Sequence, residues 1–108
     1  MDTYILTDFK GGWVVGDFIP SVLSTKAFEV AIKRYDQWER EDKHVHKIAD
    51  EVTIIVEGSV LMNGRVLGKN SVIHLKAGEA VDFFTLTPVT TCVIKTPSIV
   101  GDKYPVEK

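Results

Sequence analysis

The chain has 108 residues, of which 44% are hydrophobic and 26% are charged, and its formal net charge is −2. This length predicts a single domain with a buried core, and the near balance of 13 basic and 15 acidic residues argues against a nucleic-acid-binding protein. No apolar run approaches the roughly 20 residues of a membrane-spanning helix, the N-terminus lacks a secretion signal, and the single cysteine, Cys92, excludes an internal disulfide. We therefore expect a cytoplasmic protein with no membrane or nucleic-acid partner.

Short runs rich in Val, Ile, Thr and Phe, with apolar residues at every second position, predict strands along most of the chain. In chain order these runs cover residues 3–7, 28–35, 52–56, 60–62, 65–67, 71–75, 81–86 and 90–96. Asn63-Gly64 predicts a two-residue hairpin turn, because both central positions of a type I′ turn need positive φ. Many short strands at regular spacing predict an all-β sandwich or barrel.

The remaining segments carry weaker signals. Residues 20–24 are expected to form one helical turn that starts at Pro20. The charged residues 39–43 are expected to form a solvated loop between strands. We expect residues 1–27 to form an N-terminal strand segment that packs on the barrel or on a dimer partner, and residues 28–108 to form the main domain.

The strand at 52–56 and residues 91–94 are apolar on both faces. A small barrel has a single core, so the outer face of such strands needs a cover. Either the first 25 residues or a second copy of the chain could supply it. A homodimer is the favoured interpretation.

Two of the three histidines, His44 and His46, are separated by one residue, which places both imidazoles on one face of an extended chain. Glu51 lies at an odd offset from His46, so it faces the same side only if a bend or bulge interrupts residues 47–50. Two imidazoles and a carboxylate with open coordination positions suit Fe(II), and they also accommodate Mn, Ni, Cu or Zn.

The spacing His44-x-His46-x4-Glu51-x6-Gly58 is that of the first cupin motif, G-x5-H-x-H-x3–4-E-x6-G, with Trp38 in place of the opening glycine. The second cupin motif, G-x5-P-x-G-x2-H-x3-N, aligns with residues 70–85, where Gly78 is kept and the histidine is replaced by Val81. Over residues 28–96 the chain resembles the small stand-alone RmlC-like cupins. The resemblance implies a jelly-roll barrel, or double-stranded β-helix, that is often dimeric. It also implies His44, His46 and Glu51 as metal ligands inside the barrel.

Further residues are candidates for the same site. Glu51 is the candidate catalytic residue, acting on a bound small molecule. Tyr35, Trp38 and Phe83 could line a pocket and stack on a sugar ring, although most aromatic residues in a short chain belong to the core. Lys95 could bind an anionic group, although such lysines more often follow a solvent face. His74 could replace the missing ligand if it faces inward, but a half-buried strand histidine is the commoner case.

These residues support two main hypotheses. The first is a cupin with a divalent metal that acts on a small polar metabolite, such as a sugar or keto acid, by isomerase, epimerase, lyase or dioxygenase chemistry. The alternative is a non-enzymatic module that binds a carbohydrate or another small molecule without metal, which the loss of a ligand at Val81 favours. A third hypothesis is that the chain is an interaction protein whose barrel dimerises.

Overall fold

The computed structural model describes residues 1–106, and nearly all of its regular structure is β-strand. Two short 3-10 helices, η1 and η2, precede the strands. The elements are η1 Leu6–Asp8, η2 Lys10–Gly12, β1 Trp13–Gly16, β2 Leu23–Ser24, β3 Glu29–Tyr35, β4 Arg40–Val45, β5 Asp50–Glu57, β6 Val60–Met62, β7 Arg65–Leu67, β8 Val72–Leu75, β9 Ala80–Thr85, β10 Val89–Thr96 and β11 Tyr104–Pro105. No helix within residues 1–106 is long and apolar enough to cross a membrane.

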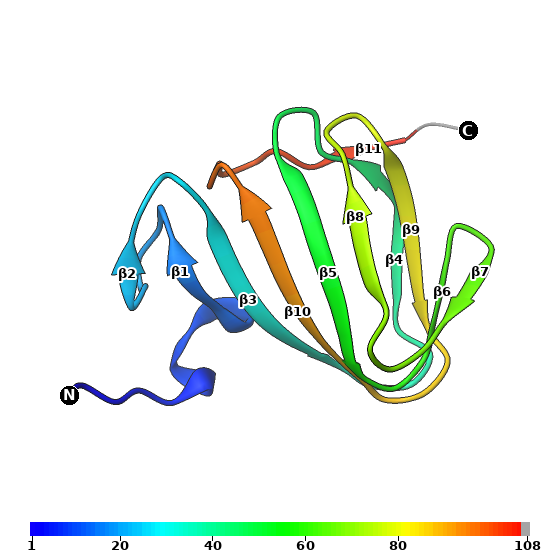
Figure 1. The fold of residues 1–108 in the computed structure, drawn as a ribbon, viewed down its shortest axis with the longest axis horizontal. Coiled ribbons are helices and arrows are strands. Elements are labelled where there is room, and N and C mark those ends of the chain that lie inside the picture. The colour runs from blue at the N-terminus through cyan, green and yellow to red at the C-terminus, as the bar shows by residue number, and fades with distance from the viewer. Residues whose placement is uncertain (107–108) are drawn as a thin grey trace.

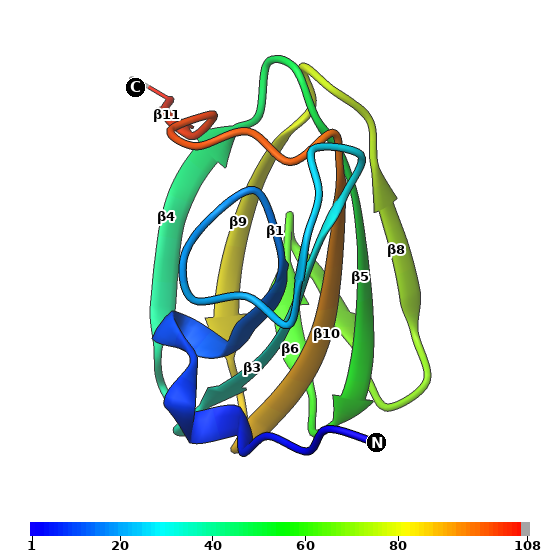
Figure 2. The ribbon, with the colours of Figure 1, turned by 90° about the vertical axis from the view of Figure 1, so that its left-hand side faces the viewer.

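The strands form two sheets that face each other (Figures 1 and 2). The first has the order β2-β1-β3-β10-β5-β8, and the second has the order β11-β4-β9-β6-β7. From β3 to β11 the chain alternates between the two sheets, apart from the β6–β7 hairpin, so it winds around one interior. This winding produces a double-stranded β-helix. The expected all-β barrel is therefore confirmed.

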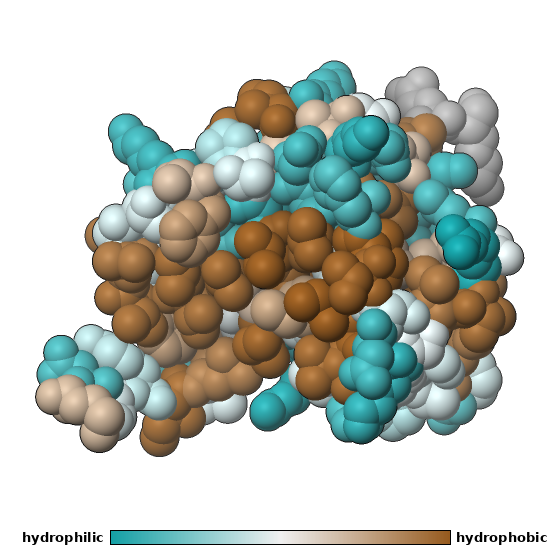
Figure 3. Space-filling view, in the orientation of Figure 1, coloured by the Kyte–Doolittle hydropathy of each residue, from teal (hydrophilic) through white to brown (hydrophobic). Residues whose placement is uncertain are grey.

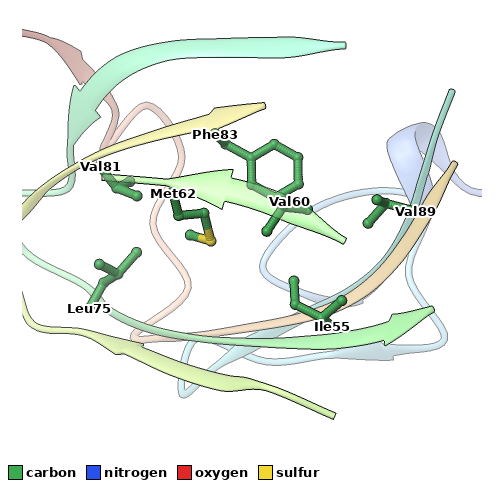
Figure 4. Close-up of a cluster of buried hydrophobic side chains, with 7 residues drawn as sticks. All are labelled: Ile55, Val60, Met62, Leu75, Val81, Phe83 and Val89. Carbon is green, nitrogen blue, oxygen red and sulfur yellow. The ribbon is translucent and has the colours of Figure 1, made fainter. Parts of the chain in front are cut away.

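The interior of the barrel changes from apolar to polar along the same strands. At one end, Ile55 on β5 and Val89 on β10 belong to a buried apolar cluster (Figure 4), whose members are Ile55, Val60, Met62, Leu75, Val81, Phe83 and Val89. Burial of each such side chain contributes about 1.5–3 kcal/mol. At the other end, the inward positions of β5 and β10 are Glu51 and Lys95. The apolar cluster fills one end of the interior and continues to Leu75 and Val81, which pair with Glu51 and His44 at the polar end.

The outer face of the first sheet is also apolar. The alternate residues that face outward from β3, β5, β8 and β10 are Val30, Ile32, Val52, Ile54, Val56, Val72, Cys92 and Ile94, with Arg34, His74 and Thr90 beside them. Figure 3, in which this face is turned toward the viewer, shows a broad hydrophobic patch. The N-terminal strands extend the sheet beyond β3 and do not cross β5 (Figure 1), so they do not supply the cover considered above.

Three expectations about local structure were wrong. Residues 3–7 do not form a strand, and part of this segment lies in the 3-10 helix η1 instead. Residues 20–24 contain no helical turn, because Leu23–Ser24 pairs with β1 as strand β2. The charged segment 39–43 is mostly strand β4 rather than a loop. Its charged side chains are tolerated because Arg40, Asp42 and Lys43 are exposed, while the backbone pairs with β9.

The other expected strands are present, with ends that differ by at most two residues. The hairpin turn is also confirmed, since Asn63 and Gly64 both have positive φ, at 47° and 76°.

Candidate functional site

The polar end of the barrel encloses a cavity of about 60 Å³, which we call the inner cavity. Its walls come from β1, β3, β4, β5, β6, β9 and β10, so residues far apart in sequence meet there. The candidate site residues from the sequence that line it are Tyr35, His44, His46, Glu51, Phe83 and Lys95, and Val81 lines it as well. Tyr35 and Phe83 pack against each other, with ring centroids 4.9 Å apart.

Strand β4 brings the two histidines to this cavity. His44 lies near the end of β4 and His46 follows it; both are buried, and their ring centroids are 5.2 Å apart. The Nδ1 atom of His44 lies 2.9 Å from the carbonyl oxygen of Asp42, and Nδ1 of His46 lies against the carbonyl oxygen of Asp102. A carbonyl oxygen only accepts hydrogen bonds, so Nδ1 of each ring must donate. This leaves Nε2 of each ring as the atom that can bind a ligand or a proton.

A turn between β4 and β5 brings Glu51 to the same side as the histidines. The carboxylate of Asp102 accepts hydrogen bonds from the backbone N–H groups of Lys47, Ile48 and Ala49 at 2.9, 3.1 and 2.9 Å. This turn is the interruption of strand periodicity that the odd offset requires. Glu51 consequently points inward and is buried, with Oε1 3.4 Å from Nε2 of His46.

The charges of His46 and Glu51 stabilise each other. The Glu51 carboxylate beside the ring raises the pKa of His46 above 6.5, although burial opposes this. Burial by itself would raise the pKa of Glu51, but the His46 ring beside it and the Thr53 hydroxyl, which donates to Oε2 at 2.9 Å, lower it below 4.5. For His44, burial lowers the pKa, which favours the neutral imidazole that a metal ion requires.

Two buried polar atoms in the described part of the chain have no hydrogen-bond partner, Nε2 of His46 and Oγ1 of Thr91, and both belong to residues that line the inner cavity. Such atoms usually interact with water, an ion or a ligand. With Nδ1 of His46 donating, Nε2 faces the Glu51 carboxylate and needs a positively charged species between them, either a proton or a metal ion. The donor set therefore suits a divalent metal.

The side chains of the three candidate ligands do not surround a common point. Among residues 1–106, no group of three His, Cys, Asp or Glu side chains is arranged to hold a metal ion. His46 and Glu51 are in contact, whereas His44 lies beside His46.

Comparison with solved structures identifies the fold. The chain superposes on a Klebsiella pneumoniae protein with a double-stranded beta-helix domain (TM-score 0.69, 20% identity, 81% of this chain and 76% of that one). It also superposes on an RmlC-like cupin from Shewanella frigidimarina (TM-score 0.66, 16% identity, 70% and 71%). The chain has the cupin fold. A third structural match is the DMSP lyase DddQ from Ruegeria pomeroyi (TM-score 0.72, 16% identity), of which 49% is covered against 87% of this chain. No protein-family model and no curated protein sequence matches the chain.

The cupin backbone is kept at positions where this chain departs from the motif residues. Trp38 and Asn70 replace motif glycines and have φ values of 69° and 73°, in the left-handed region that glycine adopts most easily. Gly58 and Gly78, which match the motifs, have φ values of 89° and 91°. The resemblance seen in the sequence is thus confirmed at the level of the fold.

Two residues considered as site candidates lie outside the inner cavity. Trp38 is 62% exposed and stacks on Phe84, on the outside of the cupin barrel, so the expectation that it lines the pocket was wrong. Its place in the turn before β4 directs it away from the interior. His74 is exposed on the outer face, with Nε2 3.8 Å from Asp50, and cannot be a fourth ligand. The wall position that the cupin motif gives to a histidine is occupied here by the apolar Val81.

Several polar residues of this cavity are not among those predicted from the sequence. Lys33 and Lys103 both lie 3.9 Å from Glu41, and all three line the cavity. The inward direction of Lys33 could have been predicted from the sequence, since it lies at every second position with Ala31 and Tyr35 on β3. The inward direction of Glu41 could not have been predicted in this way, because the β4–β9 register shifts between Glu41 and His44.

Proposed function

We propose that this cupin-fold protein binds a divalent metal ion through His44, His46 and Glu51 and uses it in a reaction on a small polar metabolite. The observation that carries the proposal is the buried Nε2 of His46, which lacks a hydrogen-bond partner and lies 3.4 Å from the Glu51 carboxylate. Two imidazoles and a carboxylate form a donor set for Fe, Mn, Ni, Cu or Zn. Because the three groups are not arranged around one point, we expect metal binding to draw the His44 ring toward this pair.

A bound divalent ion would supply polarisation of a carbonyl or enolate oxygen, or activation of water. The protein would supply the proton transfers. Glu51 has a lowered pKa and is therefore ionised at neutral pH, so its carboxylate can accept a proton. Burial raises the pKa of Tyr35 above 10.0, so its hydroxyl stays protonated and can donate a hydrogen bond to a substrate oxygen. A proton acceptor and a hydrogen-bond donor in one cavity suit isomerase or lyase chemistry on a sugar or keto acid, and the likeness to the lyase DddQ supports this class.

The first test is metal content. Protein purified without a histidine tag and incubated with Mn²⁺, Ni²⁺ or Zn²⁺ is expected to retain close to one ion per chain. The substitutions His46→Ala and Glu51→Gln should each reduce retention at least tenfold, since losing a ligand or its charge weakens binding strongly. His74→Ala is the matched control, because it removes an exposed histidine from the outer face. Equal retention in the wild type, His46→Ala and His74→Ala would refute the metal site.

The alternative is a binding module that holds a small molecule without metal or catalysis. The absence of a three-ligand cluster in residues 1–106 and the apolar Val81 at the motif histidine position favour it. Thermal unfolding separates the two functions. Stabilisation by sugars or keto acids in the presence of a chelator supports the binding module, whereas stabilisation that requires the metal supports the enzyme.

A further inference from the structure

A second, larger cavity opens directly beside the inner cavity, and we call it the outer groove. Its volume is about 310 Å³, against about 60 Å³ for the inner cavity. Trp13, Lys95 and Lys103 line both spaces, so they form a common boundary between them. The groove is therefore about five times as large as the inner cavity and is the one of the two with room for the body of a small metabolite.

The far side of the outer groove is apolar. Most of its hydrophobic lining comes from the N-terminal segment and from the segment after β10. These residues are Phe18, Ile19, Pro20, Ile99 and Val100, and Ala49 in the turn before β5 adds to them. Ile19 is 91% exposed and Val100 is 81% exposed, so the groove offers apolar surface that the fold itself does not cover. An apolar body is therefore suited to this part of the site.

The boundary carries a positive charge that the protein does not neutralise by contact. Within residues 1–106, Nζ of Lys95 makes no hydrogen bond and no ion pair, and it lies 5.2 Å from the centre of the Trp13 ring. The acids nearby are engaged elsewhere. Glu29 accepts a hydrogen bond from the backbone N–H of Ile99 at 3.2 Å, and Asp102 accepts those of the turn before β5. Each of the two spaces is lined by three lysines and two acidic residues.

The strand register limits how much negative charge a ligand of Lys95 can carry. Lys95 on β10 is directly opposite Glu51 on β5 and Glu29 on β3, so the three side chains point into the same end of the barrel. One ammonium with two carboxylates on the neighbouring strands offers little net positive charge, which suits a monoanion better than a dianion. No arginine lines either space among the described residues, which also argues against a phosphate.

We propose that the outer groove and the inner cavity form one site for a small amphipathic carboxylic acid, with its carboxylate on Lys95 and its apolar chain in the groove. The carboxylate end of the molecule then lies next to the inner cavity, which contains His46 and Glu51. In this respect the inference rests on the proposed function. The contacts with Lys95 and the groove do not depend on a metal ion.

Binding can be followed through Trp13, which lies at the boundary of the two spaces. In a Trp38→Phe background Trp13 is the only tryptophan, and Trp38 is exposed on the outer surface away from both spaces. The probes are butanoate and hexanoate, with hexanol as the uncharged match. We expect hexanoate to quench or shift the Trp13 fluorescence and to bind about tenfold more tightly than butanoate, because two more methylene groups are buried.

Substitutions at Lys95 and at Ile19 test the two halves of the site. Lys95→Met, which keeps the length of the side chain, should weaken hexanoate binding at least tenfold, and Lys95→Arg should restore most of it. Ile19→Ser, at an exposed position that does not endanger folding, should weaken hexanoate while leaving butanoate unchanged. Lys76→Met is the matched control, because Lys76 is exposed and lines neither space. Hexanol that binds as tightly as hexanoate, or Lys95→Met that binds hexanoate like the wild type, would overturn the proposal.

The same titration in the presence of a chelator separates this inference from the function proposed above. Hexanoate binding that depends on Lys95 without metal supports the carboxylate site even if the metal assay fails. Retention of metal together with no hexanoate binding would overturn the carboxylate site and leave the metal proposal standing.

Discussion

Gly58 closes the sequence motif that contains His44, His46 and Glu51, and its surroundings explain why a side chain does not fit there. Its φ is 89°, and a Cβ atom at this position would lie 2.2 Å from the carbonyl oxygen of Pro88. Gly64 has a similar φ of 76°, but nothing lies within 4 Å of its Cβ position. The two glycines therefore share the backbone requirement, and only Gly58 has the steric one.

This contrast makes a prediction about stability. Gly64→Ala should lower the free energy of unfolding by about 1–2 kcal/mol, the cost of a left-handed conformation for a residue with a Cβ. Gly58→Ala should cost more than that, because the backbone of Pro88 must also move. Urea unfolding of both variants beside the wild type measures the difference. Equal losses would show that the close approach of Pro88 is unimportant.

At the scale of elements, the segment after β10 holds the turn that joins β4 to β5. Asp102 on this segment is 6% exposed, and its carboxylate accepts the backbone N–H groups of Lys47, Ile48 and Ala49. Its carbonyl oxygen accepts the Nδ1–H of His46. One residue of the C-terminal segment thus fixes both the ring of His46 and the turn that directs Glu51 inward.

We expect Asp102→Asn to destabilise the fold by about 1–3 kcal/mol at neutral pH, since buried N–H groups lose a charged acceptor. Burial by itself would raise the pKa of Asp102, but the three N–H groups lower it below 3.8. A lowered folded-state pKa stabilises the protein above the unfolded value and loses this contribution as the pH falls through the folded value. The difference between wild type and Asp102→Asn, measured by urea unfolding from pH 7 to pH 3, should therefore shrink below pH 3.8. A constant difference would argue against this role.

At the scale of the whole molecule, the apolar outer face of the first sheet remains uncovered in a single chain. Its centre is made of Ile54 and Cys92, which are paired across β5 and β10, and its exposed edge includes Val72. We propose that a second copy of the chain packs on this face, because the face is broad and continuous across four strands (Figure 3). Glu51 and Lys95, which line these spaces from the first sheet, alternate with the residues that face outward, so a dimer on the outer face leaves both spaces accessible.

Light scattering coupled to size-exclusion chromatography tests this arrangement. The wild type should have twice the mass of one chain. Ile54→Lys should shift it toward the monomer, since it places a charge at the centre of the buried face. Val66→Lys, at an exposed position on β7 in the other sheet, is the matched control and should remain dimeric. A monomeric wild type would remove the dimer from consideration.

The sequence by itself determined the strands with regular alternation, the Asn63-Gly64 turn and the pairing of His44 with His46, because each depends on neighbours within a few residues. Only the tertiary structure decided that Glu51 faces inward, because the turn before β5 is held by Asp102, about fifty residues further along the chain. The same holds for β4, whose charged sequence forms a strand because β9 and β11 pair with it. Local preferences set the elements, whereas contacts between distant segments set which side chains share a cavity.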